Sequence, residues 1–328
     1  MKELIRKLTS ISSPSGREEQ VRAVIKEEIA SSVDEIYEDK LGNLIAVKHG
    51  GKTKVLLAAH MDEIGIIVTD IDEQGFLRFG NVGGINPQRL VGQRARFTNG
   101  TIGVFGVEKL EENEKLTLSK LYLDIGARSA EEARQKVMVG SVATYYHEFC
   151  DLGDRIVAKA LDDRIGCAIL IEALKRVTKP QNDLYCTFTV QEEVGLRGAR
   201  TAAFGIEPDY GIAIDVTGTG DTPEAERLAI KLGHGAAIKV KDNSLITHPK
   251  VKDLLTGLAV KNKIPYQFEV LPFGGTDSGA IHLTKEGVPS GVISIPCRYL
   301  HTPSEMVDMN DVEAAVRLAV AVMETKLD

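Results

Sequence analysis

Two kinds of hydrophobic pattern divide the chain. Residues 1–66 and 151–328 alternate short apolar runs with stretches whose apolar positions recur at helical spacing, whereas residues 67–150 carry many short β-like runs separated by glycine. Alternating strands and helices are typical of a sheet covered by helices, and closely spaced short strands are typical of a barrel or sandwich. The pattern therefore predicts an α/β fold, in which a domain with a helix-covered mixed sheet is interrupted by a small all-β, barrel-like domain.

The strands and helices of the larger domain follow from the same pattern. Apolar runs predict strands at residues 44–48, 54–59, 155–159, 184–190, 210–214, 236–240, 266–270 and 288–295. Helical spacing predicts helices at residues 165–177, 198–204, 250–262, 276–283 and 310–326, after a first short helix around Leu4 to Leu8. The run at 54–59 is almost wholly apolar, as expected for a strand that is buried on both faces.

Two further helices have a recognisable start. Ser15 and Glu18 match a capping box, which predicts a helix beginning there with Val21, Ile25 and Ile29 on its apolar face. Ser129 to Glu132 forms a second such box and opens a helix at 130–137 within the inserted domain. The β-like runs around that helix lie at residues 76–79, 94–97, 101–107, 121–124 and 142–146.

Composition narrows the class of protein. The 328 residues are 43% hydrophobic and 27% charged, and the net charge of −7 offers no basic surface for nucleic acid. No apolar run approaches the ~20 residues that span a bilayer, and the N-terminus lacks the apolar region of a signal peptide. Four cysteines without a CxxC pair are typical of reduced thiols. We therefore expect a cytoplasmic protein that binds neither nucleic acid nor membranes.

Residues of the kind that bind metals follow several of the predicted strands. They are His60 and Asp62 after 54–59, Asp162 at a strand-to-helix turn, Glu192 and Glu193 after 184–190, Asp215 after 210–214, and His301 beyond 288–295. The carboxyl ends of strands in one open sheet meet at the same edge, where ligands bind. Imidazoles and carboxylates suit zinc or cobalt, and neither ion needs a thiolate here.

Each of these residues also has an ordinary structural interpretation. His60 could be a satisfied core histidine, Asp162 could cap the helix that starts near Ile165, and Asp215 and His301 could be loop residues. Asp62 follows His60 by two residues, which puts both on one side of an extended strand and suits a carboxylate that orients an imidazole. Taken together, the acids and imidazoles at one sheet edge favour a metal site.

At this point the motifs match a known family. The matching segments are AAHMDEIG (58–65), KALDDRIG (159–166), TVQEEVGLRGA (189–199), IDVT (214–217), GHGAAIKVKD (233–242), GGTDSG (274–279) and IPCRYLHTPSEM (295–306). They are collinear and span nearly the whole chain. The chain resembles the TET-type metallo-aminopeptidases, which are self-compartmentalising tetrahedral peptidases that include glutamyl and deblocking aminopeptidases.

The resemblance implies a function and an assembly. It implies a zinc-exopeptidase-like catalytic domain (1–66 and 151–328) that acts on peptide substrates, and a barrel-like dimerisation domain (67–150) whose dimers assemble into a tetrahedral dodecamer. It also implies two divalent metal ions, zinc or cobalt, per subunit. In the implied site, Asp162 bridges the two ions, His60 and Asp215 complete the ligands of one ion, and Glu193 and His301 complete those of the other. Asp62 would be the partner of His60, and Glu192 would be the general base.

Two other functions remain as alternatives. One is a different co-catalytic metal hydrolase on a similar scaffold, a deacylase or a glucanase, and the other is a non-catalytic oligomeric scaffold. The intact set of ligand-type residues argues against the scaffold, since it has no need of Glu192. The sequence leaves open the preferred N-terminal residue, the native metal and the group that binds the substrate amine.

Overall fold

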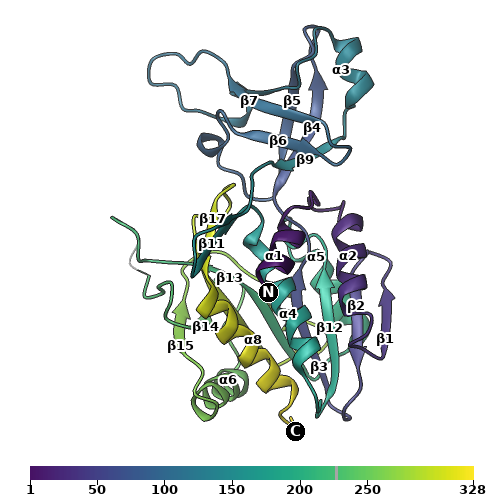
Figure 1. Cartoon of the computed structure of the whole chain (residues 1–328), viewed down its shortest axis with the longest axis vertical. Helices are drawn as coiled ribbons and strands as arrows, with labels where there is room; N and C mark the ends of the chain where they lie inside the picture. Colours follow the sequence, from purple (N-terminus) through teal and green to yellow (C-terminus); the bar gives the residue numbers. More distant parts are fainter. Residues whose placement is uncertain (226–227) are drawn as a thin grey trace.

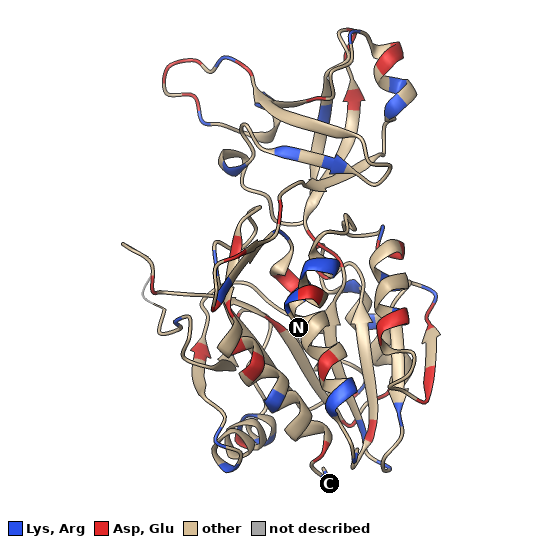
Figure 2. Ribbon diagram, in the orientation of Figure 1, with Lys and Arg blue, Asp and Glu red and all other residues tan. Residues whose placement is uncertain are grey.

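The fold consists of a large sheet domain with a small barrel at one end (Figure 1). The computed structural model describes residues 1–225 and 228–328. Among these residues no helix is long and apolar enough to cross a membrane. Acidic and basic residues alternate along the outer helices and along the barrel (Figure 2). The predicted fold class, a helix-covered mixed sheet with an inserted barrel, is confirmed.

Four parallel strands form the centre of the large sheet. They are β12 (Asp183–Thr189), β3 (Lys54–His60), β13 (Tyr210–Gly218) and β16 (Ser290–Arg298), in that order. Antiparallel strands extend both sides: β2 (Leu44–Lys48) and β1 (Glu35–Glu38) beyond β12, and β17 (Glu305–Asp308), β11 (Arg155–Ala158) and β10 (Cys150–Asp151) beyond β16. β14 (Ala236–Lys241) pairs with β16 and with β15 (Tyr266–Val270). The carboxyl ends of the central strands therefore lie at one edge.

Helices bury both faces of this sheet, as strand β3 illustrates. Its Leu57 packs in the large core beneath α1 (Lys2–Thr9), α2 (Glu19–Ile29), α4 (Leu161–Arg176), α6 (Pro249–Lys261) and α8 (Met309–Met323). Its Leu56 packs in a second cluster beneath α5 (Arg197–Ile206) and α7 (Ser278–Ile281). Successive side chains of a strand point to opposite faces, so the continuous apolar run follows from burial on both sides.

The barrel closes on itself and has a core of its own. Its strands run in the order β4 (Gly65–Ile71), β5 (Leu77–Val82), β8 (Leu121–Asp124), β7 (Ile102–Val107), β6 (Arg94–Phe97) and β9 (Val142–Tyr145). Helix α3 (Ala130–Lys136) begins at the predicted capping box, where the Ser129 hydroxyl accepts a hydrogen bond from the Glu132 amide at 3.2 Å. Short turns η1 (Pro87–Arg89) and η2 (Leu118–Lys120) complete the domain.

Two predictions at the level of single elements are wrong. The capping box at Ser15 does not form, because the Ser15 hydroxyl donates to Asp62 and α2 begins only at Glu19, without a side-chain cap. Strand β13 does not stop at residue 214 but continues to Gly218, since it stays paired with β16, and Asp215 therefore lies within the strand. Strand β17 was not predicted at all.

Candidate metal centre

The predicted site residues come together at the carboxyl edge of the sheet. His60 ends β3, Asp215 lies in β13, and Asp162 lies in the first turn of α4, where the backbone is not helical. Glu192 and Glu193 follow β12, and His301 follows β16. These six residues line one cavity of about 730 Å³, whereas Asp62 lies behind it with no exposed surface.

Two groups of ligand-type atoms share one carboxylate. His60, Asp162 and Asp215, here called the inner triad, have ligand atoms within 4.8 Å of one another, and so do Asp162, Glu193 and His301, the outer triad. The Oδ1 atom of Asp162 lies 3.0 Å from His60 Nε2, and its Oδ2 atom lies 3.3 Å from His301 Nε2. One oxygen of Asp162 therefore faces each triad, which is the arrangement of a bridging ligand.

The carboxylates of the cavity are poorly compensated by the side chains around them. Burial raises the pKa of Asp215 and of Glu193 to about 8, and the neighbouring Asp162 carboxylate adds to both shifts. Burial likewise raises the pKa of Glu192 well above its usual value. Within the described part of the chain, Glu193 Oε1 is buried and has no hydrogen-bond partner. Since buried charge requires a counterion, this donor set fits divalent cations.

The histidines and Asp162 behave as partners in the same cluster. Although burial alone would raise it, hydrogen bonds with His301 and His60 hold the pKa of Asp162 well below its usual range. Burial opposes protonation of His301, but Glu193 and Asp162 outweigh it and raise the His301 pKa to about 10. A cation bound between these acids and imidazoles would therefore displace protons from them.

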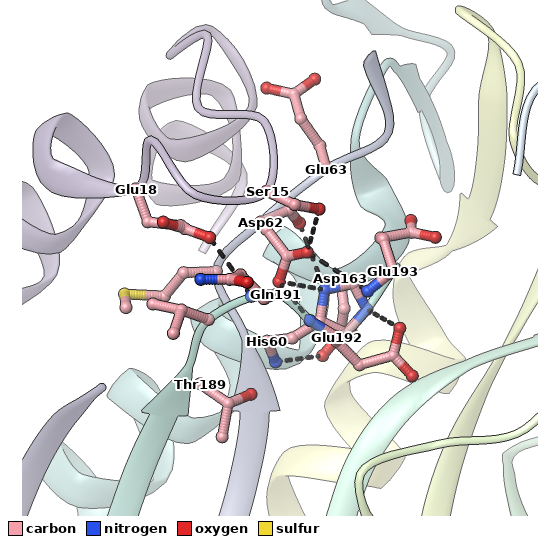
Figure 3. A network of polar contacts seen from close by, with 12 residues as sticks. Ser15, Glu18, His60, Asp62, Glu63, Asp163, Thr189, Gln191, Glu192 and Glu193 are labelled. Carbon is pink, nitrogen blue, oxygen red and sulfur yellow. Dashed lines mark hydrogen bonds and ion pairs between the residues drawn. The ribbon is translucent and has the colours of Figure 1, made fainter. Parts of the chain in front are cut away.

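Asp62 connects His60 to the acid pair (Figure 3). His60 Nδ1 lies 3.2 Å from the Asp62 carbonyl oxygen and 3.6 Å from its Oδ1. The Asp62 carboxylate also accepts hydrogen bonds from the backbone amides of Glu192, at 3.0 Å, and Glu193, at 3.2 Å. It therefore supports both the imidazole and the loop that carries the two glutamates.

The sequence did not single out Glu305, which braces two of the ligand-type residues. Its Oε2 atom accepts a hydrogen bond from the Asp162 amide at 3.0 Å, and its Oε1 atom accepts one from the His301 amide at 2.8 Å. Glu305 is buried in β17. The only sequence signal was an acid four residues after His301, within the last matching motif.

The barrel also contributes to the site through two glycines that were not predicted. His301 Nδ1 lies 2.9 Å from the Gly84 carbonyl oxygen, which accepts its proton and leaves Nε2 directed at the outer triad. A Cβ atom on Gly84 would lie 2.8 Å from His301 Nδ1, and one on Gly83 would lie 3.1 Å from Glu193 Cβ. Such close approach requires glycine at both positions.

Comparison with known proteins identifies the family. The model of the M42 glutamyl aminopeptidase family matches residues 42–318. The chain belongs to this family. A relative from Acetivibrio thermocellus that is named as an aminopeptidase is 54% identical over 321 residues. The match covers 98% of this chain and 97% of the relative.

Solved structures of an aminopeptidase and of a TET peptidase match nearly the whole fold. An aminopeptidase from the archaeon Desulfurococcus kamchatkensis has a TM-score of 0.95 at 43% identity and covers 98% of this chain and 94% of its own. The TET1 peptidase of Pyrococcus horikoshii, described as assembling into a tetrahedron or a large octahedral shell, has a TM-score of 0.90 at 36% identity, with 98% of each chain covered. The chain is thus a TET-type M42 aminopeptidase and a peptide hydrolase.

One of the structural alternatives, a capping role for Asp162, can be judged in this M42 fold. Asp162 does not cap α4, because its neighbour Asp163 takes that place, with Oδ1 accepting the Gly166 amide at 3.0 Å. The other oxygen of Asp163 accepts the His60 amide at 3.2 Å. His234, within the matching segment 233–242, is exposed and does not line the cavity.

Proposed function

We propose that this aminopeptidase depends on two divalent ions per subunit, zinc or cobalt, and removes N-terminal residues from peptides. The observation that carries the proposal is the position of Asp162, which directs one carboxylate oxygen into each triad. His60 and Asp215 would complete the inner ion's ligands, and Glu193 and His301 would complete those of the outer ion. Bound there, two divalent ions would polarise the scissile carbonyl and lower the pKa of an attacking water.

Glu192 is assigned the proton transfer. It lines the cavity but belongs to neither triad, and its Oε2 atom lies 3.9 Å from His60 Nε2. Burial raises its pKa well above the usual value of a carboxyl group, which favours accepting a proton from water before releasing it to the leaving amine. A transfer of this kind contributes about 10²–10⁴-fold to a rate. Because Asp62 holds the amides of both glutamates, the two consecutive side chains keep different directions.

The cavity has room for an N-terminal residue beside the triads. Its walls away from the triads include Leu196, Leu271 and Phe273 from the sheet domain and Ile85 from the barrel. The cation of Lys239 at the same wall is held by Asp242, at 3.0 Å, and by Glu269 at 2.9 Å. These apolar walls beside the triads support a peptide substrate.

An assembly is proposed on the strength of the relatives. Residues 67–150 would serve as the dimerisation domain, and the dimers would form a tetrahedral dodecamer. A related structure consists of a dodecamer, and that protein, at 35% identity and a TM-score of 0.90, covers 98% of this chain. Light scattering coupled to size-exclusion chromatography checks the assembly, and a stable monomer would contradict it.

The reaction is tested by two adjacent substitutions assayed on aminoacyl anilides. Glu192→Gln should bind as much zinc or cobalt as the wild type and lose turnover by about 10²–10⁴-fold. Glu193→Gln is the matched control, since the same change one residue later should reduce metal content together with activity. Wild-type hydrolysis by the Glu192→Gln variant would disprove the proton-transfer role. Cellulose oligomers assayed in parallel test the glucanase alternative.

A further inference from the structure

The segment from Ser15 to Glu18 contacts the loop of the acid pair, although the sequence assigned it to a helix cap. Ser15 Oγ donates a hydrogen bond to Asp62 Oδ2 at 2.6 Å, the shortest that this carboxylate receives (Figure 3). Glu18 Oε1 accepts hydrogen bonds from the amides of Gly16, at 2.6 Å, and Gln191, at 3.2 Å. Both side chains that a capping box would use therefore point toward the active-site loop.

Asp62 transmits the contact of Ser15 to both glutamates. The same Oδ2 atom that accepts from Ser15 accepts from the Glu193 amide at 3.2 Å, and Oδ1 accepts from the Glu192 amide at 3.0 Å. Asp62 has no exposed surface, so its carboxylate depends on protein donors for its hydrogen bonds. Without the Ser15 hydroxyl, Oδ2 would keep only the longer bond from the Glu193 amide.

The backbone before the acid pair needs such support. Gln191 has a φ of 56°, in the left-handed region that a residue with a side chain rarely adopts. The carboxylate of Glu18 receives the amide of this residue. The strained turn lets Glu192 and Glu193 leave the strand in different directions, and the N-terminal segment holds that turn from outside.

The N-terminal segment is itself firmly anchored. The Ser13 amide donates to Glu63 Oε1 at 3.1 Å, and Arg164 Nη2 donates to the Ser13 carbonyl oxygen at 3.3 Å. Lys159 Nζ lies 2.8 Å from both oxygens of Glu63. This buried ion-pair cluster ties the segment to the start of α4, so Ser15 approaches Asp62 from a fixed position.

We propose that Ser15 is a positioning residue, whose hydroxyl holds Asp62 so that the acid pair keeps one carboxylate in the outer triad and the other free for proton transfer. The inference rests on the proposed function for the roles of Glu192 and Glu193. Ser15 acts through Asp62 and does not line the cavity. Loss of such supporting contacts to metal ligands costs about 10–100-fold in metal affinity or activity.

The test compares two serines of the same segment. Ser15→Ala removes the hydroxyl on Asp62, whereas Ser13→Ala removes a buried hydroxyl that has no hydrogen-bond partner among the residues described. We expect Ser15→Ala to weaken binding of one of two cobalt ions and to lower kcat, each by about 10–100-fold, with KM unchanged. Ser13→Ala should match the wild type, and Ser15→Thr, which keeps the hydroxyl, should restore both values.

The outcomes separate this inference from the proposed function. A cobalt titration monitored by calorimetry measures the affinity for the ions, so it tests the positioning role without any catalytic turnover. If the wild type binds two cobalt ions but hydrolyses no aminoacyl anilide, the proposed function is wrong. The cobalt titration of Ser15→Ala would still decide whether Ser15 positions the acid pair. Equal cobalt affinity and equal kcat in Ser15→Ala and Ser13→Ala would overturn the inference. If Ser15→Ala fails to fold, Ser15→Thr is compared with Ser15→Cys, whose thiol is a weaker donor of similar size. Equal cobalt affinity and equal kcat in those two variants would also overturn the inference.

Discussion

The inner and outer triads use the same kinds of residue but are built in different ways. The inner triad takes His60 from β3 and Asp215 from β13, two paired parallel strands, and the His60 side chain is only 2% exposed. In the outer triad, Glu193 and His301 come from loops, and the His301 side chain is 35% exposed. The inner triad lies within the sheet domain, whereas the outer triad also rests on the glycines of the barrel.

This difference indicates where the site is rigid and where it can be adjusted. Strand register fixes His60 and Asp215 of the inner triad, because His60 pairs with β12 and Asp215 with β16, and moving either would break the pairing of the central sheet. The outer triad depends on side chains that support loops, namely Asp62 under Glu193 and Glu305 under His301. We therefore expect changes outside the ligands, in the barrel or at the N-terminus, to affect the outer ion first.

The largest effect is expected where the two triads overlap. Asp162→Asn replaces the shared carboxylate by an amide, which cannot offer an anionic oxygen to each side. Both ions should be lost or weakly held, and hydrolysis of aminoacyl anilides should fall by more than about 10³-fold. Elemental analysis after dialysis and a rate assay measure both results. Retention of two ions would show that the triads are independent of each other.

The next prediction separates the triads through their histidines. His60→Ala should remove one ion and lower the free energy of unfolding by about 1–3 kcal/mol, because it leaves buried carboxylates without a partner. His301→Ala should also remove one ion but change stability less, since His301 is partly exposed. The metal content of each variant shows whether one ion is lost, and urea unfolding of the metal-free variants measures the loss of stability. Equal losses of stability would contradict the proposed difference in construction.

The convergence of the ligand-type residues was predictable, because the carboxyl ends of parallel strands meet in any sheet of this kind. His60, Glu193 and Asp215 each end or follow an apolar run that periodicity alone identifies. Which of Glu192 and Glu193 has which role was not predictable from the residues. That distinction came from the family resemblance, since two adjacent acids look alike in sequence.

The supporting residues could not have been predicted from local patterns. Glu305 and Ser15 act on parts of the chain far away in sequence, and such contacts leave no periodicity. Gly84 carries a close approach to His301 that only the packing of two domains creates. The capping box at Ser15 failed for the same reason, because a tertiary partner, Asp62, competes with the helix end for the hydroxyl.

A third prediction concerns the pH dependence of metal affinity. Each triad contains one carboxyl group whose pKa is raised. Burial raises the pKa of Asp215, in the inner triad, and of Glu193, in the outer triad, to about 8. Below that pH an entering ion must displace a proton, so metal affinity should fall as pH drops from 8 to 6, by up to about 10-fold per unit for each proton displaced. Cobalt titrations in buffers of different ionisation enthalpy measure the proton release. An affinity independent of pH would contradict the shifts.

The smallest effect is expected from a change that touches only the outer triad, through the barrel. In Gly84→Ala the added methyl group would lie 2.8 Å from His301 Nδ1, so the imidazole must move away from the Gly84 carbonyl oxygen and from the outer triad. We expect the affinity for one ion to fall by about 10-fold, the low end of the range for supporting contacts, while the other ion is unaffected.

Gly80→Ala is the matched control for this prediction, because it lies in the same barrel and its methyl group would meet only ordinary contacts at 3.7 and 3.8 Å. If Gly84→Ala weakens both ions equally, the two triads respond as one unit, and the contrast between a rigid inner and an adjustable outer triad is wrong. If only one ion is weakened, the barrel acts on the chemistry through His301, and the inserted domain belongs to the active site.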